Sequence, residues 1–190
     1  MNIMGKIVIV GNGSSLLQKQ LGATIDTFMN IVRFNGYVVK GFEMQVGKRT
    51  TIWSRSYRCP AMQETTQLDS VWVNMPLPRR TMENVAEAYR LLGRYAGSIQ
   101  IIPTLEVATS LQRRLFGDHD LGRWPSSGLL AIAHAIDQGF DVWIAGIDCW
   151  EREPYHYYGH HDRSDTHHVA DREAECVASW ISDGAVNVLG

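Results

Sequence analysis

Short β-branched runs alternate along this 190-residue chain with longer stretches whose apolar residues recur every three or four positions. The short runs are typical of strands buried on both faces of a parallel sheet, and the longer stretches are typical of amphipathic helices. Strands are expected at 6–10, 30–34, 50–53, 70–74, 98–102, 141–146 and 185–189, and helices at 16–22, 81–94, 104–115, 126–138 and 168–181. This alternation predicts a single domain over residues 1–190, a three-layer α/β/α sandwich with a mostly parallel sheet.

The composition is that of a soluble globular protein, with 45% hydrophobic and 20% charged residues. A net charge of −2 and a pI near 6.4 argue against a general nucleic-acid or membrane-surface binder. No apolar run approaches the roughly 20 residues of a membrane span, and no signal peptide precedes the first strand. The three cysteines have neither zinc spacing nor a disulfide pattern. We expect a cytoplasmic protein, whose membrane contact would come from a partner or a surface patch, and a homo-oligomer stays open.

The first strand runs into a turn of two glycines and three small polar residues, Gly11-Asn12-Gly13-Ser14-Ser15. A strand, a glycine turn and a helix start together can bind an anion. Backbone N–H groups point outward, glycine admits a phosphate, and the helix dipole favours negative charge. The turn lacks the third glycine of the dinucleotide fingerprint and the ending of a P-loop. It is either an ordinary first turn of an α/β domain or one wall of a phosphate site.

A second helix start of this kind follows Pro125, at Ser126, Ser127 and Gly128. Its hydroxyl and N–H groups can hold a phosphate or a base edge, and the ordinary interpretation is helix capping. Ligands of parallel sheets bind beyond the carboxyl ends of the strands. The residues expected at those ends are Asn12, Asn35, Ser54, Asp148 and a loop with His156, Tyr157 and Tyr158, and Trp53 and Trp150 are expected to line a pocket.

The last helix offers a candidate general base. His168 is expected in its first turn, and Glu173 lies more than one turn further on. The dipole at a helix N-terminus lowers the proton affinity of a histidine, so His168 can act as a base. The ordinary interpretation is a surface histidine near a helix cap, and His167 is the adjacent competitor.

The histidine-rich loop also raises the question of a metal. Five of the seven histidines lie between His156 and His168, but none forms a His-Glu-x-x-His pair. The stretch Asp118-His119-Asp120 lies in a polar loop rather than at a strand end. A metal site is therefore the less favoured interpretation of both stretches, and neither a metal nor a cofactor is expected.

Taken in order, these segments resemble the four motifs of the sialyltransferase family. The large motif is similar to residues 10–16 and 32–35, the small motif to 125–131 through 142–146, the third motif to 156–158, and the very small motif to 168–173. The same segments are similar to small bacterial sialyltransferases, in which Ser-Gly opens a helix and Gly-Ile-Asp follows the next strand. The four segments follow the family's order and span nearly the whole chain.

This resemblance implies a variant GT-A, Rossmann-like fold. It also implies a metal-independent, inverting transfer of a sugar from a CMP-sugar donor to a glycan or glycolipid hydroxyl. His168 is then the general base, supported by Glu173. The resemblance places Asn12, Ser127 and His156 on the phosphate, with Tyr157 or Tyr158 assisting, and Asn35 on the nucleotide. The other residues of the expected donor site are Gly13, Ser14, Ser54, Ser126, Gly128, Asp148 and Trp150.

The chain departs from the family in two respects. It is short, and no cysteine lies near Gly11 or Ser127, so the usual disulfide between the large and small motifs is absent. The transferred sugar is therefore expected to be sialic acid or another CMP-linked acid sugar such as Kdo. Two other interpretations stay open, a nucleotide-binding module without transferase activity and a metal hydrolase built on the histidine loop.

Overall fold

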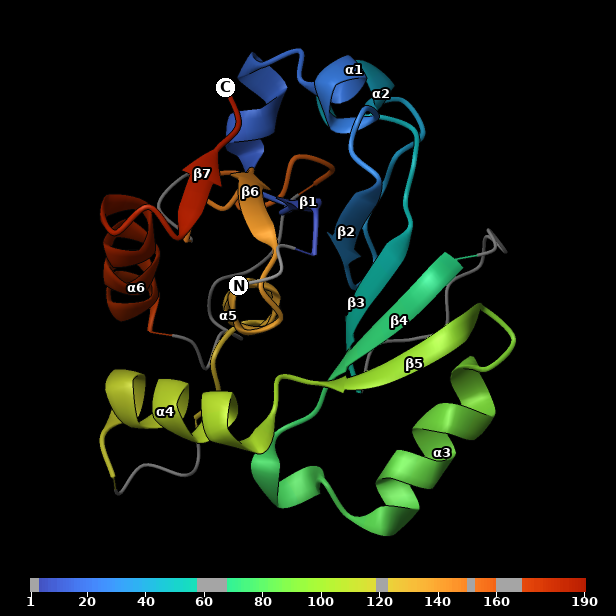
Figure 1. Ribbon diagram of the computed structural model, residues 1–190. Coiled ribbons are helices and arrows are strands. Elements are labelled where there is room, and N and C mark those ends of the chain that lie inside the picture. The colour runs from blue at the N-terminus through green and yellow to red at the C-terminus, as the bar shows by residue number, and fades with distance from the viewer. Residues whose placement is uncertain (1–3, 58–67, 119–122, 150–152, 160–168) are drawn as a thin grey trace.

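The computed structural model describes residues 4–57, 68–118, 123–149, 153–159 and 169–190. A seven-stranded sheet runs through this part of the chain (Figure 1). Its strands are β1 (Lys6–Val10), β2 (Asn30–Phe34), β3 (Ile52–Ser56), β4 (Leu68–Asn74), β5 (Ala96–Ile102), β6 (Asp141–Ala145) and β7 (Val186–Val188). Their order in space is β5-β4-β3-β2-β1-β6-β7, and all their pairings are parallel. The predicted α/β architecture with a parallel sheet is confirmed.

Helices cover both faces of this sheet. The longer ones are α3 (Met82–Leu92), α4 (Leu105–Phe116), α5 (Ser127–Asp137) and α6 (Ala170–Ser182), and the short ones are η1 (Ser14–Gln18), α1 (Gly22–Ile25), α2 (Glu43–Val46) and η2 (Leu77–Arg79). One core cluster joins α4, α5 and α6 to one face of the sheet, and two others join η1, α1, α2 and α3 to the opposite face. No helix in the described part of the chain is long and apolar enough to cross a membrane.

The two-sided core follows from the β-branched composition of the strands. Successive side chains of a strand point to opposite faces. In β1, Ile7 and Ile9 accordingly pack on the side of α5, whereas Val8 and Val10 pack on the side of η1 and α1. All four are at most 1% exposed, so β1 is a central strand covered on both faces, as its unbroken apolar run predicts.

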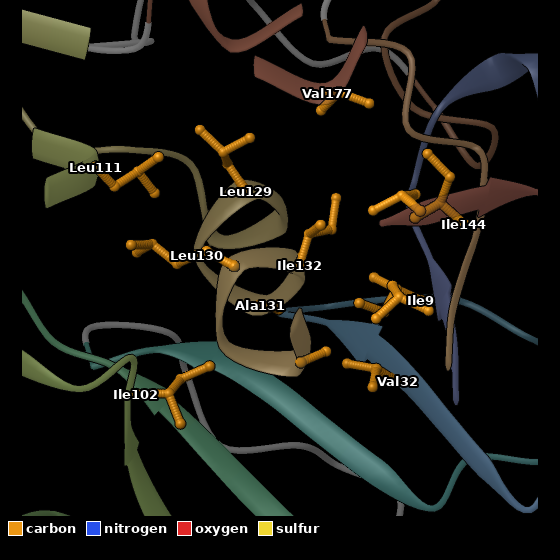
Figure 2. Close-up of a cluster of buried hydrophobic side chains, with 14 of the residues drawn as sticks. Ile9, Val32, Ile102, Leu111, Leu129, Leu130, Ala131, Ile132, Ile144 and Val177 are labelled. Carbon is orange, nitrogen blue, oxygen red and sulfur yellow. The ribbon is translucent and has the colours of Figure 1, made fainter. Parts of the chain in front are cut away.

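Helix α5 is the centre of the larger core cluster (Figure 2). Every residue from Leu129 to Ala135 is buried, and a helix that is apolar all round is typical of a buried element. In Figure 2, Ile132 points toward Ile9 and Ile144 of the sheet, and Leu129 lies on the side of α4 and α6. The helix therefore holds the sheet and its two neighbouring helices together.

Three predictions from the sequence are wrong between residues 16 and 56. The single helix expected at 16–22 is instead η1 followed by α1. The backbone at Gly22 lies against α2, since a Cβ there would stand 2.0 Å from the Glu43 carbonyl oxygen. Strand β3 continues past Trp53 to Ser56. Trp53 is fully buried and packs edge-on against Tyr95, at 5.6 Å between ring centroids. The prediction that Trp53 lines a pocket is therefore wrong.

His134 is a polar residue inside the α5 layer. Its ring packs edge-on against Trp72, with 4.8 Å between centroids, and its Nε2 lies 3.3 Å from Oε1 of Gln100. Burial disfavours the imidazolium and lowers the pKa of His134 from 6.5 to about 4, partly offset by Asp137. The ring is therefore neutral at pH 7.

We predict that His134 makes the fold sensitive to acid. The unfolded chain takes up this proton near pH 6.5 and the folded chain near pH 4, so stability is complete above pH 6.5 and falls as the pH decreases between these values. The fall attributable to His134 is about 3 kcal/mol. Urea unfolding at pH values from 8 to 4.5 measures this fall. In His134→Gln, the free energy of unfolding should decrease less between pH 8 and pH 4.5 than it does in the wild type. An equal slope in wild type and variant would contradict the prediction.

Candidate functional site

The sheet has one topological switch point, between β1 and β6. From β1 the chain moves outward through β2, β3, β4 and β5, and β6 then returns to the other side of β1. Ligands of open parallel sheets bind where the strand order reverses, beyond the carboxyl ends of the strands. The residues at this position are the turn after β1, which begins at Gly11, and the turn after β6, which begins at Gly146.

These two turns are in direct backbone contact. Gly11 N–H donates to the Ala145 carbonyl at 2.8 Å, and Gly13 N–H donates to the Gly146 carbonyl at 3.0 Å. A Cβ on Gly11 would stand 2.1 Å from the Gly146 oxygen, and one on Gly13 would stand 2.4 Å from the Asp148 carboxyl group. Both glycines are required by this close approach rather than by an unusual φ angle.

The N-terminus of η1 already binds an anion from within the chain. Asp148 accepts hydrogen bonds from the Ser15 N–H at 2.9 Å and from the Ser15 Oγ at 2.5 Å. A carboxylate at a helix N-terminus satisfies a free N–H group and complements the helix dipole. The sequence leaves open whether this turn is an ordinary first turn or one wall of a phosphate site, and in the structure the Asp148 carboxylate accepts the Ser15 N–H and hydroxyl groups. Ser14, in the same turn, is buried.

Asn12 is the side chain of this turn that is left with an unused polar atom. Its backbone carbonyl accepts the Tyr157 N–H at 2.9 Å. Its Oδ1 is buried and has no hydrogen-bond partner among the described residues. Buried polar side-chain atoms nearly always have a partner, and the oxygen and nitrogen of an amide are assigned from their partners. Asn12 is therefore chemically suited to a polar ligand at the switch point.

The loop with His156 lies against the same turn because Tyr157 fixes it there. Besides its N–H bond to Asn12, Tyr157 donates its hydroxyl to the Val38 carbonyl and packs edge-on against Phe42, at 5.1 Å between centroids. The ring is only 4% exposed, and burial raises the pKa of its hydroxyl. Tyr157 thus belongs to the wall of the site, and its hydroxyl is already bonded.

His156 and Tyr158 flank this anchor and are half-buried. Their rings lie 5.1 Å apart, between centroids, at an angle of 39°. Because Tyr157 binds the backbone of Asn12, its two neighbours are held next to the β1 turn. Among the three predicted loop residues, His156 and Tyr158 are therefore those whose side chains suit a ligand.

The N-terminus of α5 is the third component of the site. Ser126 is its N-cap and accepts the Leu129 N–H at 3.2 Å. Ser127 and Gly128 follow and are half-buried. A Cβ on Gly128 would lie 3.8 Å from the side chain of Ile147, in the turn after β6. The start of α5 and the β6 turn are therefore neighbours, as a shared anion site requires.

Asn35 and Ser54 differ in their positions. Asn35 follows β2 with a φ of 45°, and its Oδ1 accepts the Ser56 N–H at 2.8 Å. Ser54 lies inside β3 rather than at its end, is fully buried and accepts a hydrogen bond from Asn74 Nδ2 at 3.1 Å. The predicted strand-end position holds for Asn35 and is wrong for Ser54, because β3 is longer than the sequence pattern indicates.

Arg33 stabilises the strand that carries Asn35. It is 1% exposed and donates to the Val46 carbonyl at 2.5 Å and to Thr50 Oγ1 at 3.0 Å. Burial lowers the pKa of its guanidinium. Arg33 therefore ties β2 to the end of α2 and to the segment that follows it.

Comparison with known proteins gives this arrangement a family context. Residues 3–75 match the family described as glycosyltransferase family 29 (sialyltransferase). A human CMP-N-acetylneuraminate-beta-1,4-galactoside alpha-2,3-sialyltransferase is 44% identical over 70 residues, 36% of this chain and 18% of that protein. A mouse type 2 lactosamine alpha-2,3-sialyltransferase is 29% identical over 184 residues, 81% of this chain and 54% of that protein. The chain thus spans about half the length of the mouse relative and less of the human one.

Solved structures agree with these sequence matches. A mammalian sialyltransferase in complex with Gal-beta-1-3GalNAc-ortho-nitrophenol has a TM-score of 0.70 at 21% identity, over 97% of this chain and 68% of that one. The sialyltransferase CstII from Campylobacter jejuni, in complex with cytidine-5'-monophosphate, has a TM-score of 0.66 at 14% identity, over 100% and 81%. At these identities the likeness shows a shared fold. The chain is sialyltransferase-like.

Several predicted residues of the sialyltransferase-like chain lie outside the described residues. These are Trp150, His167 and His168, together with His119, Asp120, His160 and His161. Glu173 is described, and its Oε1 accepts the Ser126 N–H at 2.8 Å. The predicted supporting residue is thus joined to the N-cap of α5, although the general base itself stays a prediction.

Gly146 is a residue of this site that the sequence pattern does not reveal. It supplies the carbonyl that receives Gly13 N–H. In the sequence it only ends an apolar strand, and nothing in its neighbourhood indicates contact with the first turn.

We predict that the β1 turn of the sialyltransferase-like chain does not tolerate a methyl group. Gly11→Ala places its Cβ against the Gly146 carbonyl and should lower the free energy of unfolding by about 3 kcal/mol. Gly97→Ala in β5 is the matched control, since nothing lies within 4 Å of its added Cβ; its effect should stay within about 1 kcal/mol. Urea unfolding measures both. If Gly11→Ala proved as stable as the control, the contact between the two turns would be wrong.

Proposed function

We propose that this chain is the catalytic core of a glycosyltransferase that uses a CMP-sugar donor. The observation that carries the proposal is the convergence at the switch point. Residues 3–75, which match the sialyltransferase family, contain Asn12 and Asn35. Asn12 lies against the Tyr157 loop, and the β6 turn next to it contacts the start of α5. The fold shared with a sialyltransferase solved with cytidine-5'-monophosphate supports a nucleotide at this place.

The donor phosphate is proposed to bind between Asn12, His156 and the N-terminus of α5 at Ser127. Neutral donors and the helix dipole stabilise the charge that develops on the departing phosphate oxygen. Asn35 contacts the nucleotide. These groups supply the electrostatic stabilisation without a metal, which makes the proposed mechanism metal-independent, in a variant GT-A, Rossmann-like fold.

The proposed reaction is a single inverting displacement. The acceptor hydroxyl attacks the anomeric carbon, the bond from that carbon to the CMP phosphate oxygen breaks, and CMP leaves with the electron pair. His168 takes the proton of the attacking hydroxyl as general base. This residue stands two positions before Ala170, the first residue of α6, in the sequence.

The transferred sugar is proposed to be sialic acid or a related acid sugar such as Kdo, and the acceptor a glycan or glycolipid hydroxyl. Both the human and the mouse relative are named as alpha-2,3-sialyltransferases, one of a beta-1,4-galactoside and one of type 2 lactosamine. Their names support a galactose-containing acceptor. The alternative function is a nucleotide-binding module without transfer.

We predict that CMP raises the melting temperature without added metal. At a CMP concentration about 100 times its dissociation constant, stability should rise by roughly 2.7 kcal/mol, which corresponds to roughly 5–10 °C for a chain of this size. UDP, GDP and NAD are the comparison ligands, and EDTA should leave the CMP shift unchanged. A shift with UDP alone would contradict the proposed donor, and loss of the CMP shift in EDTA would contradict metal independence.

The same assay tests Asn12. Asn12→Ala should weaken CMP binding by about ten-fold or more, because the amide loses a hydrogen bond to a charged group. Asn30→Ala is the matched control, since Asn30 starts β2 at the opposite end of the strands and bonds only the Lys6 carbonyl among the contacts described for its side chain. Equal CMP affinity in the two variants would exclude Asn12 from the phosphate site.

We further predict that His168→Ala separates binding from transfer. Loss of a general base typically lowers the rate by roughly 10²–10⁴-fold, whereas CMP affinity should stay near that of the wild type. Transfer from CMP-sialic acid and CMP-Kdo to galactose-terminated acceptors measures the rate, with His167→Ala as control. A large loss in His167→Ala with normal activity in His168→Ala would move the base to His167. CMP binding without transfer by the wild type would favour the nucleotide-binding module.

A further inference from the structure

The N-terminus of α5 has only half of a standard capping arrangement of its own. The N-cap Ser126 accepts the N–H of Leu129, the third helical residue, at 3.2 Å. In a capping box, the residue at that third position is Glu or Gln, whose side chain accepts the N–H of the N-cap in return. Leu129 is 2% exposed and belongs to the core, so it cannot provide this acceptor.

The missing acceptor comes from another helix. Glu173, in the first turn of α6, is 2% exposed, and its Oε1 accepts the Ser126 N–H at 2.8 Å. Its own N–H donates to the Val169 carbonyl, which holds Glu173 within that first turn. A carboxylate here also complements the positive end of the α5 dipole. The capping box of α5 is thus completed by a residue 47 positions further along the chain.

The residue before Glu173 makes a complementary contact with α4. Arg172 donates from Nη1 to the Leu115 carbonyl at 2.5 Å. Leu115 lies in the last turn of α4, where carbonyl groups have no partner inside the helix and cations are favoured. Two adjacent residues of α6 therefore hold the end of one helix and the start of the next. Figure 1 shows these three helices on the same side of the sheet.

We propose that Glu173 is a positioning residue that completes the α5 capping box and thereby aligns the phosphate-binding start of α5 with the start of α6. The proposal rests on the proposed function, because it gives Ser127 to the phosphate and His168, which precedes α6, to the acceptor. The start of α5 and the first turn of α6 are joined through the buried hydrogen bond from Ser126 N–H to Glu173 Oε1. The role proposed for Glu173 depends on the position of its acceptor oxygen, and the contribution of its charge is tested separately.

Two substitutions separate geometry from charge. Glu173→Gln keeps the reach of the acceptor oxygen and removes the charge, whereas Glu173→Asp keeps the charge and shortens the side chain by one methylene. Asp171→Asn is the matched control, an exposed carboxylate in the same turn of α6 that has no part in the cap. The full chain is used, at a temperature at which circular dichroism shows each variant to be folded.

Amide hydrogen exchange of residues 126–130 and the CMP dissociation constant are the two measurements. In Glu173→Asp, we expect these amides to exchange about ten-fold faster and CMP to bind about ten-fold more weakly, since a hydrogen bond to a buried group is lost. Glu173→Gln should remain within about three-fold of the wild type in both measurements. Asp171→Asn should match the wild type. This order, Gln close to wild type and Asp impaired, supports the proposal.

Three outcomes overturn it. A normal Glu173→Asp together with an impaired Glu173→Gln would assign the effect to charge. Wild-type behaviour of both variants would leave Glu173 without a positioning role. Faster amide exchange in Glu173→Asp with unchanged CMP affinity would show that Glu173 stabilises the start of α5 without positioning it for the phosphate. If the wild type binds no CMP, the proposed function fails, and hydrogen exchange still decides whether Glu173 caps α5.

Discussion

The contact between the β1 turn and the β6 turn is the constraint on which the rest of the site depends. It joins residues 133 positions apart, through the two hydrogen bonds from Ser15 to Asp148 and the bond from Gly13 to Gly146. Its close approach excludes every side chain at Gly11 and Gly13. The Ser15 N–H and hydroxyl groups are bonded to Asp148, and Asn12 beside them keeps a side-chain oxygen without a partner among the described residues. The glycine turn therefore contributes more to the shape of the site than to contacts with a ligand.

The other components of the site are held by hydrogen bonds in which at least one partner is a backbone group. The Tyr157 loop is attached to the Asn12 carbonyl, and its phenol is attached to the Val38 carbonyl. The N-cap of α5 is attached to Glu173. Side chains that suit a ligand, such as His156 and Asn12, stand beside these anchors. Positional accuracy of this kind is what electrostatic stabilisation of a leaving group requires.

The strands and the long helices were predictable from the sequence, because a short β-branched run such as 6–10 and a longer run rich in Ala and Leu such as 129–135 differ in length and composition. The strand-end residues Asn12, Asn35 and Asp148 followed from the parallel topology. Local sequence does not reveal which group occupies the N-terminus of η1. That depends on Asp148 reaching across from β6, a contact set by tertiary packing. Ser54 was misplaced for a related reason, since pairing with β4 extends β3 beyond its apolar residues.

The strand order also determines when the site can exist. β1 is made first, is apolar on both faces and pairs on one side with β2, but its other edge has no partner until β6 has been synthesised. An unpaired apolar strand edge promotes aggregation. The nascent chain therefore carries β1 half-paired until residues 141–145 have been synthesised, and a fragment ending before residue 141 would lack the β6 turn that Gly11 and Gly13 contact. The late pairing of β1 with β6 therefore affects the solubility of the nascent chain during synthesis more than the stability of the folded protein.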